Sequence, residues 1–297
     1  MFSRRRYGGD SAIIVTAPLP MHSEQFQLHA DIEERHWWFV GRRRIFRRLV
    51  AEVLPSSPQT TIVDVGCGTG GNIAALADQY RSVGIDTSAE AVELARRRFP
   101  RVQFIAGQAP SELGELAELA RLFLLTDVLE HLDDDYAMFS ELLSAASPGS
   151  YFLVTVPADE SLWSEHDESF GHYRRYDRTR LEGIWAGLPA TTLLISYFNA
   201  RLLPVVRGFR AWNRRRGRAA GRSGTDFWLP SPPVNALLTS IFSGEATRLV
   251  AALGGRKRGY RAGASLLALV RRDDGAIAIR SKPDGLPPDC GRRTHPA

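Results

Sequence analysis

The fold of this chain is decided by the stretch Ile62-Val63-Asp64-Val65-Gly66-Cys67-Gly68-Thr69-Gly70-Gly71. A β-branched run leads into an acid and then into a glycine-rich turn, and residues 72–77 follow with a helical pattern. Strand, tight turn and helix in this order predict the entrance to a nucleotide-type pocket. Glycines suit such a turn because the backbone can bend sharply and lie against a ligand without Cβ atoms in the way.

Spacing alone leaves two ligands open. Gly66, Gly68 and Gly71 satisfy the dinucleotide pattern, and Asp86 follows at about the 20-residue distance expected of an acid that binds ribose. Asp64 separates the two ligands, because a carboxylate that faces the pocket opposes a pyrophosphate. The same carboxylate suits a ligand that carries an ammonium and a sulfonium.

The pattern Asp-x-Gly-x-Gly-x-Gly over residues 64–70 resembles the first motif of class I S-adenosylmethionine-dependent methyltransferases. The resemblance implies that the cofactor is held by Asp64, Gly66, Cys67, Gly68, Gly70, Asp86, Thr87, Gln108, Ala109, Asp127 and Val128. Within this set we expect Asp86 to accept the ribose hydroxyls and Asp127 to line the methionine end. Gln108 stands where the family often has an acid near the adenine, and its amide can still bond the adenine amino group.

Runs typical of buried strands recur after the glycine turn, over 81–86, 101–108, 122–132 and 151–157, and residues 262–272 are expected to close the sheet. Helical patterns lie between them, and the clearest follows Ser88, its expected N-cap. Strands that alternate with helices imply a parallel sheet that is covered on both faces. We therefore predict an α/β fold with a Rossmann-like, seven-stranded, mostly parallel sheet and a helical cap.

Two other functions remain open at this point. An NAD-binding oxidoreductase would share the glycine turn, but no Tyr here is followed four residues later by Lys, the pair that polarises a carbonyl in many dehydrogenases. A catalytically silent S-adenosylmethionine-binding module that serves a partner protein would share the whole motif set, although intact Asp64, Asp86 and Asp127 argue against it. The methyltransferase interpretation is therefore favoured.

Chemistry on the acceptor is expected after the fourth and fifth strands, because ligands lie beyond the carboxyl ends of strands in open sheets. His166 and His172 are the candidate catalytic bases, since imidazole can remove a proton from a hydroxyl or an amine, and Asp167 can orient one of them. In the alternative, both histidines anchor a loop, while Arg174 and Arg175 pair with carboxylates.

No metal site is predicted. The acids at 133–135 stand at the start of a helix, where negative charge is favoured, and no partner ligands follow at a fixed spacing. His131 belongs to the run Asp-Val-Leu-Glu-His-Leu at 127–132, which again resembles the family, and we expect it to be structural or to support residues that touch the ligand.

The chain divides into three parts by composition. Residues 1–25 are expected to be a flexible leader, with translation starting at Met1 or Met21, and residues 273–297 a disordered tail. The methyltransferase domain is expected to span 26–272, with an N-terminal lid over 26–54 and a cap insertion over 177–260. The aromatic and arginine-rich lid resembles the same segment of bacterial type 11/12-like methyltransferases.

Charge and cysteine content limit the expected surroundings. The net charge is +5, and because only Lys257 and Lys282 are lysines, arginine carries nearly all the positive charge. Cys67 and Cys290 suggest no disulfide framework, so a reducing cytoplasm is the expected location. The acceptor is expected to be a small or amphipathic molecule, including a lipid-linked or secondary-metabolite compound.

Residues 201–216 have the pattern of a basic amphipathic helix. We expect its apolar stripe to pack on the core and its arginines to lie in water, and peripheral contact with an anionic membrane surface is the alternative. Nucleic acid is not favoured, because no recognisable binding module with interleaved aromatics accompanies the basic residues. Nothing beyond the leader is expected to approach a membrane span.

Overall fold

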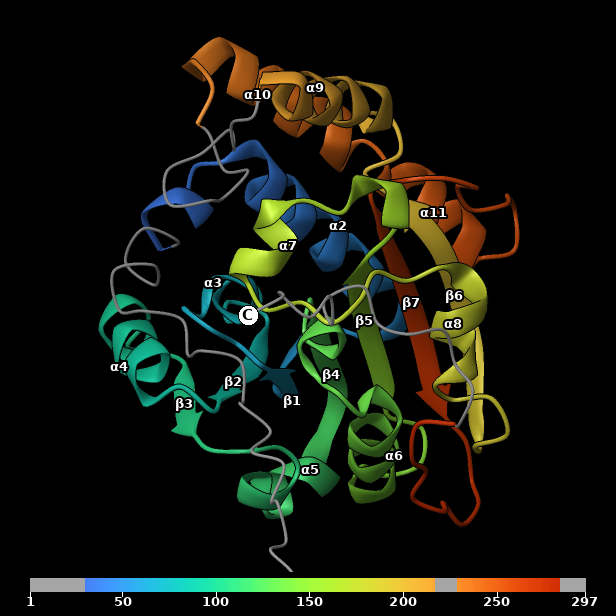
Figure 1. The fold of residues 1–297 in the computed structure, drawn as a ribbon. Helices are drawn as coiled ribbons and strands as arrows, with labels where there is room; N and C mark the ends of the chain where they lie inside the picture. Colours follow the sequence, from blue (N-terminus) through green and yellow to red (C-terminus); the bar gives the residue numbers. More distant parts are fainter. Residues whose placement is uncertain (1–29, 217–228, 284–297) are drawn as a thin grey trace, which may run out of the picture.

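The computed structural model describes residues 30–216 and 229–283, so the expected leader and the end of the expected tail lie outside the described residues. One seven-stranded sheet has the order β3-β2-β1-β4-β5-β7-β6, as Figure 1 shows. Its strands are β1 (Ser57–Val65), β2 (Tyr80–Asp86), β3 (Gln103–Ala106), β4 (Ala120–Thr126), β5 (Tyr151–Pro157), β6 (Ala190–Phe198) and β7 (Ser265–Arg272). Strands β1 to β5 are parallel and β7 is antiparallel to both its neighbours, which confirms the predicted sheet.

Helices cover both faces of the sheet. They are α2 (Trp37–Val53), α3 (Gly71–Ala74), α4 (Ala89–Arg98), α5 (Glu115–Leu119), α6 (Asp135–Ala145), α7 (Glu165–Ser169), α8 (Arg178–Gly183), α9 (Leu203–Arg216), α10 (Pro232–Ser243) and α11 (Ala246–Leu253). One apolar core joins the sheet to α5, α6 and α8, with Phe139 packed on Phe152. A second core joins it to α2, α4, α10 and α11, with Phe242 stacked on Phe198.

Local signals in the sequence explain several element boundaries. Ser88 caps α4 by accepting a hydrogen bond from the backbone N–H of Ala91 at 3.2 Å, as predicted. The strand predicted over 122–132 ends earlier, at Thr126, because Asp127 turns the chain with a positive φ of 59°. A short 3₁₀ turn, η2 (Leu129–His131), follows and carries two side chains into the site described below.

The seventh strand lies where we expected only a cap. β6 falls inside the predicted insertion 177–260, at the edge of the sheet, where it pairs with β7 alone. The β6 sequence contains several of the β-branched and aromatic residues that favour strands, so a strand signal was present there and our prediction missed it. Residues 232–253 form two helices, α10 and α11, which are divided at Gly244 and Glu245.

Residues 232–253 correct our expectation that nothing beyond the leader approaches a membrane span. By length and composition alone they are apolar enough to cross a membrane, with a mean hydropathy of 1.2. In the structure this stretch is the pair α10 and α11, which packs on α2. The turn between the two helices holds Glu245, whose buried carboxylate accepts hydrogen bonds from the backbone N–H groups of Ala200 and Arg201, each at 2.8 Å.

The amphipathic helix α9 lies the other way round from our expectation. Val205, Phe209 and Trp212 are 60%, 40% and 56% exposed, so most of the apolar stripe does not pack on the core. The arginines instead bind the domain: Arg207 pairs with Asp159 at 2.7 Å, and Arg210 donates to the carbonyl oxygen of Leu162. Figure 1 shows α9 and α10 together at the top of the molecule, beyond α7 and α2.

The first part of the tail that we expected to be disordered, residues 273–283, instead packs against the domain. The backbone N–H of Arg280 donates to Ser140 Oγ at 2.9 Å, and that of Lys282 donates to the carboxylate of Asp134 at 3.0 Å. Residues 273–283 are thus held against α6, and the rest of the predicted tail lies outside the described residues.

Candidate active site

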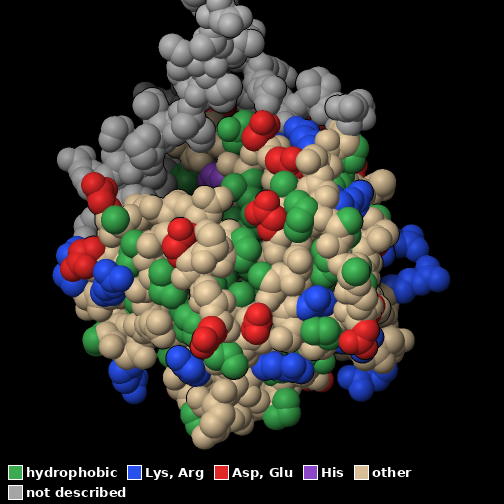
Figure 2. Space-filling model, turned by 90° about the horizontal axis from the view of Figure 1, so that it is seen from below, with side chains coloured by type: hydrophobic (Ala, Val, Ile, Leu, Met, Phe, Trp, Pro, Cys, Tyr) green, Lys and Arg blue, Asp and Glu red, His purple; other side chains and the backbone are tan. Residues whose placement is uncertain are grey.

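A cavity of about 1200 Å³ opens at the carboxyl ends of β1 and β4, where the strand order reverses. Its wall includes most of the predicted site residues: Gly66, Cys67, Gly68, Asp86, Thr87, Gln108, Ala109, Asp127, Val128, His166 and His172. Figure 2 shows one face of the molecule, on which a histidine side chain is visible in a recess of the surface. Asp64 and Gly70 were also predicted, but they do not line the cavity.

The glycine turn has the shape that its sequence predicts. Gly66 and Gly70 have φ values of 68° and 85°, which side chains rarely adopt. A Cβ atom on Gly66 would lie 2.7 Å from Val128, and one on Gly70 would lie 2.7 Å from Phe104. Gly70 therefore supports the turn from behind, whereas Gly66 forms part of the cavity wall.

Asp86 ends β2 at the floor of the cavity and is held in place by two backbone N–H groups. Gly68 N–H donates to Oδ2 and Ser88 N–H donates to Oδ1, both at 2.8 Å. Burial raises the pKa of Asp86 above its ordinary value, and these two hydrogen bonds act against that rise. A carboxylate has about four lone-pair sites, so the remaining two can accept hydrogen bonds from a ligand in the cavity.

Asp64 does not have the position that we inferred for it. It pairs in register with Gly84 of β2 and Leu124 of β4 in the middle of the sheet, and its carboxylate is fully buried. Because strand residues alternate between faces, the sequence alone did not show that this acid points behind the glycine turn and not into the cavity. Burial raises the pKa of Asp64 to about 8, against the opposing influence of the Arg42 charge.

Asp64→Asn should stabilise the protein at neutral pH and flatten its pH dependence. The folded-state pKa of about 8 lies above the ordinary value of 3.8, so folding takes up a proton between these values. Between these two pKa values, Asp64 therefore lowers the free energy of unfolding by about 1.4 kcal/mol for each unit that the pH rises. Urea unfolding at pH 5 to 8 should show a shallower decline for the variant, and equal slopes would contradict the assignment.

Arg42 of α2 reaches into the cavity and binds Asp127. Its guanidinium forms an ion pair with Asp127 Oδ2 and lies 4.0 Å from the centre of the Trp38 ring. Thr155 Oγ1 donates to the other oxygen of Asp127 at 3.2 Å, and Asn72 lies within 3.4 Å of Arg42 Nη2. The predicted lid segment thus contributes a buried positive charge beside a negative one at the cavity wall.

A second residue of the lid segment anchors it to the glycine turn. Glu33 is buried, pairs with Arg98 of α4, and accepts a hydrogen bond from Thr69 Oγ1 at 2.9 Å. Sequence reasoning missed Glu33, because nothing local indicates that an acid some 35 residues before the turn folds over it.

The histidine-rich segment is organised around Asp167. His172 Nδ1 lies 3.0 Å from Asp167 Oδ1, and Arg175 Nη2 lies 2.8 Å from the same carboxylate. These partners lower the pKa of Asp167 against the effect of its burial, so it stays ionised. Asp167 therefore orients His172. We had expected it to orient either His166 or His172. This contact leaves His172 Nε2 toward the cavity.

His166 and His131 also lie at the cavity wall, near His172. The His131 ring is 4.8 Å from that of His172, and the His166 ring is 6.3 Å from it. Burial lowers the pKa of both His131 and His166 to about 3. His131, expected to be structural or to support residues that touch the ligand, therefore faces the same space as the two candidate bases.

The arginines take the structural part that we had considered for them. Arg174 lies 3.3 Å from the carboxylate of Asp135 and donates to the carbonyl oxygen of Leu132 at 2.6 Å. Tyr176 donates to Asp135 as well, at 2.7 Å. Asp135, from the acidic run that we did not expect to bind metal, is thus a buried anchor that holds the segment after α7 against α6.

Another part of the cavity wall is apolar. Trp37 and Phe39 of α2, Val206 and Phe209 of α9, and Leu238 of α10 line this part. Val205 and Phe209 are also exposed, so the apolar lining continues to the outer surface.

Comparisons with known proteins agree with this geometry. A family described as "Methyltransferase domain" matches residues 38–212. A trans-aconitate 2-methyltransferase from Azoarcus sp. is 34% identical over 119 residues, which cover 39% of this chain and 46% of that protein. A probable S-adenosylmethionine-dependent methyltransferase from Mycolicibacterium smegmatis is 29% identical over 156 residues, which cover 50% of this chain and 56% of that protein. The chain thus spans about half the length of these curated relatives.

Solved structures share the fold. The plantazolicin methyltransferase BpumL, in complex with SAH, superposes with a TM-score of 0.52 at 13% identity, over 84% of this chain and 90% of that chain. At this identity the likeness shows the fold alone.

Proposed function

The chain belongs to the methyltransferase domain family, and we propose that it transfers the methyl group of S-adenosylmethionine to a small or amphipathic acceptor. One observation carries the proposal: a single cavity joins the glycine turn and Asp86 to an apolar mouth, by way of Asp127 and His172. S-adenosylmethionine, when bound, supplies a methyl group on a sulfonium. The chain supplies the positioning of both reactants, which can account for much of the rate of such a displacement.

The residues of the inner cavity fit the chemical groups of this cofactor. Asp86 has two lone-pair sites left for the ribose hydroxyls. The methionine part of the cofactor is a zwitterion, and Arg42 and Asp127 together offer one charge of each sign. Thr87, Gln108 and Ala109 remain for the adenine side of the wall.

His172 is the proposed proton acceptor on the acceptor side. Because Asp167 lies at Nδ1, the Nε2 lone pair is left toward the cavity. A hydroxyl or amine acceptor would lose its proton to Nε2 while its lone pair forms the bond to the methyl carbon. The sulfur–carbon bond breaks in the same step, and its electron pair stays on sulfur.

Calorimetry and product release test the proposal directly. The protein should bind S-adenosylhomocysteine and not NAD, and a panel of acceptors should release S-adenosylhomocysteine from S-adenosylmethionine. Cofactor binding with no release from any acceptor would favour the silent binding module, and binding of NAD alone would overturn the cofactor assignment.

The exposed apolar mouth supports an acceptor that carries an alkyl or lipid-linked chain. Phe209 lines the cavity and is 40% exposed, so a chain that leaves the cavity can cover it. Peripheral contact of residues 201–216 with an anionic membrane at the cytoplasmic side is part of the same proposal, since Val205 and Trp212 are exposed beside Phe209. Retention on anionic vesicles is its direct test.

Phe209→Ser should raise KM for a chain-bearing acceptor by about 10- to 150-fold, because burial of such a side chain contributes about 1.5–3 kcal/mol and about 1.4 kcal/mol is a factor of ten. The KM of a short polar congener should change less than twofold. Val234→Ser is the matched control, since Val234 is 45% exposed on α10 but does not line the cavity. Equal changes for both acceptors would show that Phe209 does not contact the chain.

A further inference from the structure

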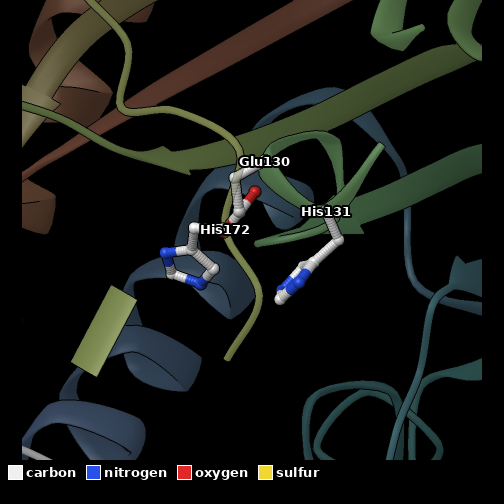
Figure 3. A group of neighbouring side chains, drawn as sticks. All are labelled: Glu130, His131 and His172. Atoms are coloured by element: carbon white, nitrogen blue, oxygen red, sulfur yellow. The ribbon is translucent and has the colours of Figure 1, made fainter. Parts of the chain in front are cut away.

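Three potential metal ligands meet at the boundary between the cofactor and acceptor parts of the cavity. Glu130 and His131 come from η2, after β4, and His172 comes from the segment after α7. Their ligand atoms all lie within 4.8 Å of one another, and Figure 3 shows the three side chains directed toward a common space. The backbone N–H of Tyr173 donates to the carbonyl oxygen of Glu130 at 2.8 Å, which ties the two segments together.

We propose that Glu130, His131 and His172 bind a divalent first-row transition ion such as Zn²⁺. Two imidazoles and one carboxylate are a ligand set that these ions favour, and they leave at least one coordination position for a substrate. All three residues line the cavity, so that position faces the acceptor.

Glu130 is the first independent support for an ion. Its side chain is fully buried, and neither carboxylate oxygen has a hydrogen-bond partner within 30–216 and 229–283. A buried carboxylate is normally paired or bound to a metal. Among the other buried acids, Asp167 is bound by Arg175 and Asp135 by Arg174. Asp64 also has no partner for its carboxylate oxygens in the described part of the chain, but unlike Glu130 it does not line the cavity or lie beside two histidines.

His172 is the second support. Metal-binding histidines usually donate their other ring N–H to a carboxylate, which fixes the tautomer and aims the free nitrogen at the ion. The Asp167 carboxylate lies 3.0 Å from His172 Nδ1 in this arrangement, so Nε2 is the nitrogen left for the ion.

The ligand atoms of Glu130, His131 and His172 must move closer together to bind an ion. Ligands at about 2.1 Å from a tetrahedral ion lie roughly 3.4 Å apart. The ligand atoms here all lie within 4.8 Å of one another, so a separation near that limit must shrink when the ion binds. Rotation of an imidazole ring about its own side-chain bonds provides that movement without a change in the backbone.

An ion here would define the acceptor more narrowly, an extension that rests on the proposed methyl transfer. It would take an oxygen of the acceptor and lower the pKa of that hydroxyl, whose proton passes to water. The oxygen lone pair then forms the bond to the methyl carbon while the sulfur–carbon bond breaks, and the sulfur keeps the electron pair. The site therefore predicts an oxygen acceptor. With the ion bound, the Nε2 lone pair of His172 would be a ligand, and water would replace His172 in the role of proton acceptor that we propose for the ion-free enzyme.

Metal binding by the tag-free protein tests this without any turnover. Titration with Zn²⁺ by calorimetry and with Co²⁺ by visible absorption should show one ion per chain with a Kd in the micromolar range or below. Glu130→Gln, His131→Ala and His172→Ala should each weaken binding at least tenfold. His166→Ala is the matched control, because this neighbouring histidine is outside the ligand set and should leave the affinity unchanged.

Cofactor affinity separates this proposal from the proposed function. A variant of a metal-binding residue is taken as folded when its affinity for S-adenosylhomocysteine is within threefold of wild type. If His131→Ala does not fold by this measure, His131→Gln replaces it. The metal site is overturned if wild type binds neither Zn²⁺ nor Co²⁺. It is also overturned if all three variants bind the ion with the same affinity as wild type. Methyl transfer that persists unchanged after chelation also overturns it, but leaves the methyltransferase assignment standing.

Discussion

Turnover should fall by about 10²–10⁴-fold when His172 is replaced with asparagine, the range typical for loss of a positioned proton-transfer group. The asparagine amide can still donate a hydrogen bond to Asp167, so the loop should keep its shape, while the lone pair of Nε2 is gone. The measurement is kcat/KM with an acceptor found by the release assay. Affinity for S-adenosylhomocysteine should stay within threefold.

His166→Asn is the comparison for this prediction. Burial lowers the pKa of His166 to about 3, which makes it a weak proton acceptor at neutral pH, so its loss should cost less than tenfold. Wild-type turnover in the His172 variant would remove His172 from the chemistry altogether. If His166→Asn loses more turnover than His172→Asn, then His166 is the proton acceptor and His172 is not.

Cofactor affinity should fall at least 100-fold in Asp86→Asn. The Asp86 carboxylate accepts from Gly68 N–H and Ser88 N–H together, and an asparagine at this position has one oxygen and can satisfy only one of them. The amide NH₂ of the asparagine would face the other backbone N–H, and this unpaired contact costs about 1–3 kcal/mol. The negative charge that strengthens the hydrogen bonds to the ribose would also be lost. Calorimetry with S-adenosylhomocysteine measures the effect.

Glu93→Gln is the control for Asp86→Asn. Glu93 is an exposed acid on α4 that pairs only with surface arginines, so its loss should leave cofactor affinity unchanged. Affinity in the Asp86 variant within threefold of wild type would show that Asp86 holds the turn and does not bind the ribose.

Local patterns predicted most of the residues that line the inner cavity. The glycine turn, the acid at the end of β2 and the residues after β4 each follow a strand directly, and the carboxyl ends of neighbouring parallel strands meet at one edge of a sheet. Asp64 is the exception, since its side of the strand depends on register and not on spacing.

The residues missed by the sequence are those that reach the cavity from a distance. Arg42 binds Asp127 across 85 positions of the chain, and no local pattern distinguishes it from Arg43 or Arg44. Glu130 and His131 drew no metal prediction because their partner, His172, lies about 40 residues away, at no fixed spacing from them.

The sequence by itself determined that this protein has a mostly parallel α/β sheet with a glycine turn at its ligand edge. It could do so because strand, turn and helix signals act over a few residues. Only the tertiary structure decided that Asp64 is buried, that Arg42 joins Asp127, and that Glu130 and His131 face His172. These features depend on how separate segments pack, and packing brings together residues whose positions along the chain carry no common pattern.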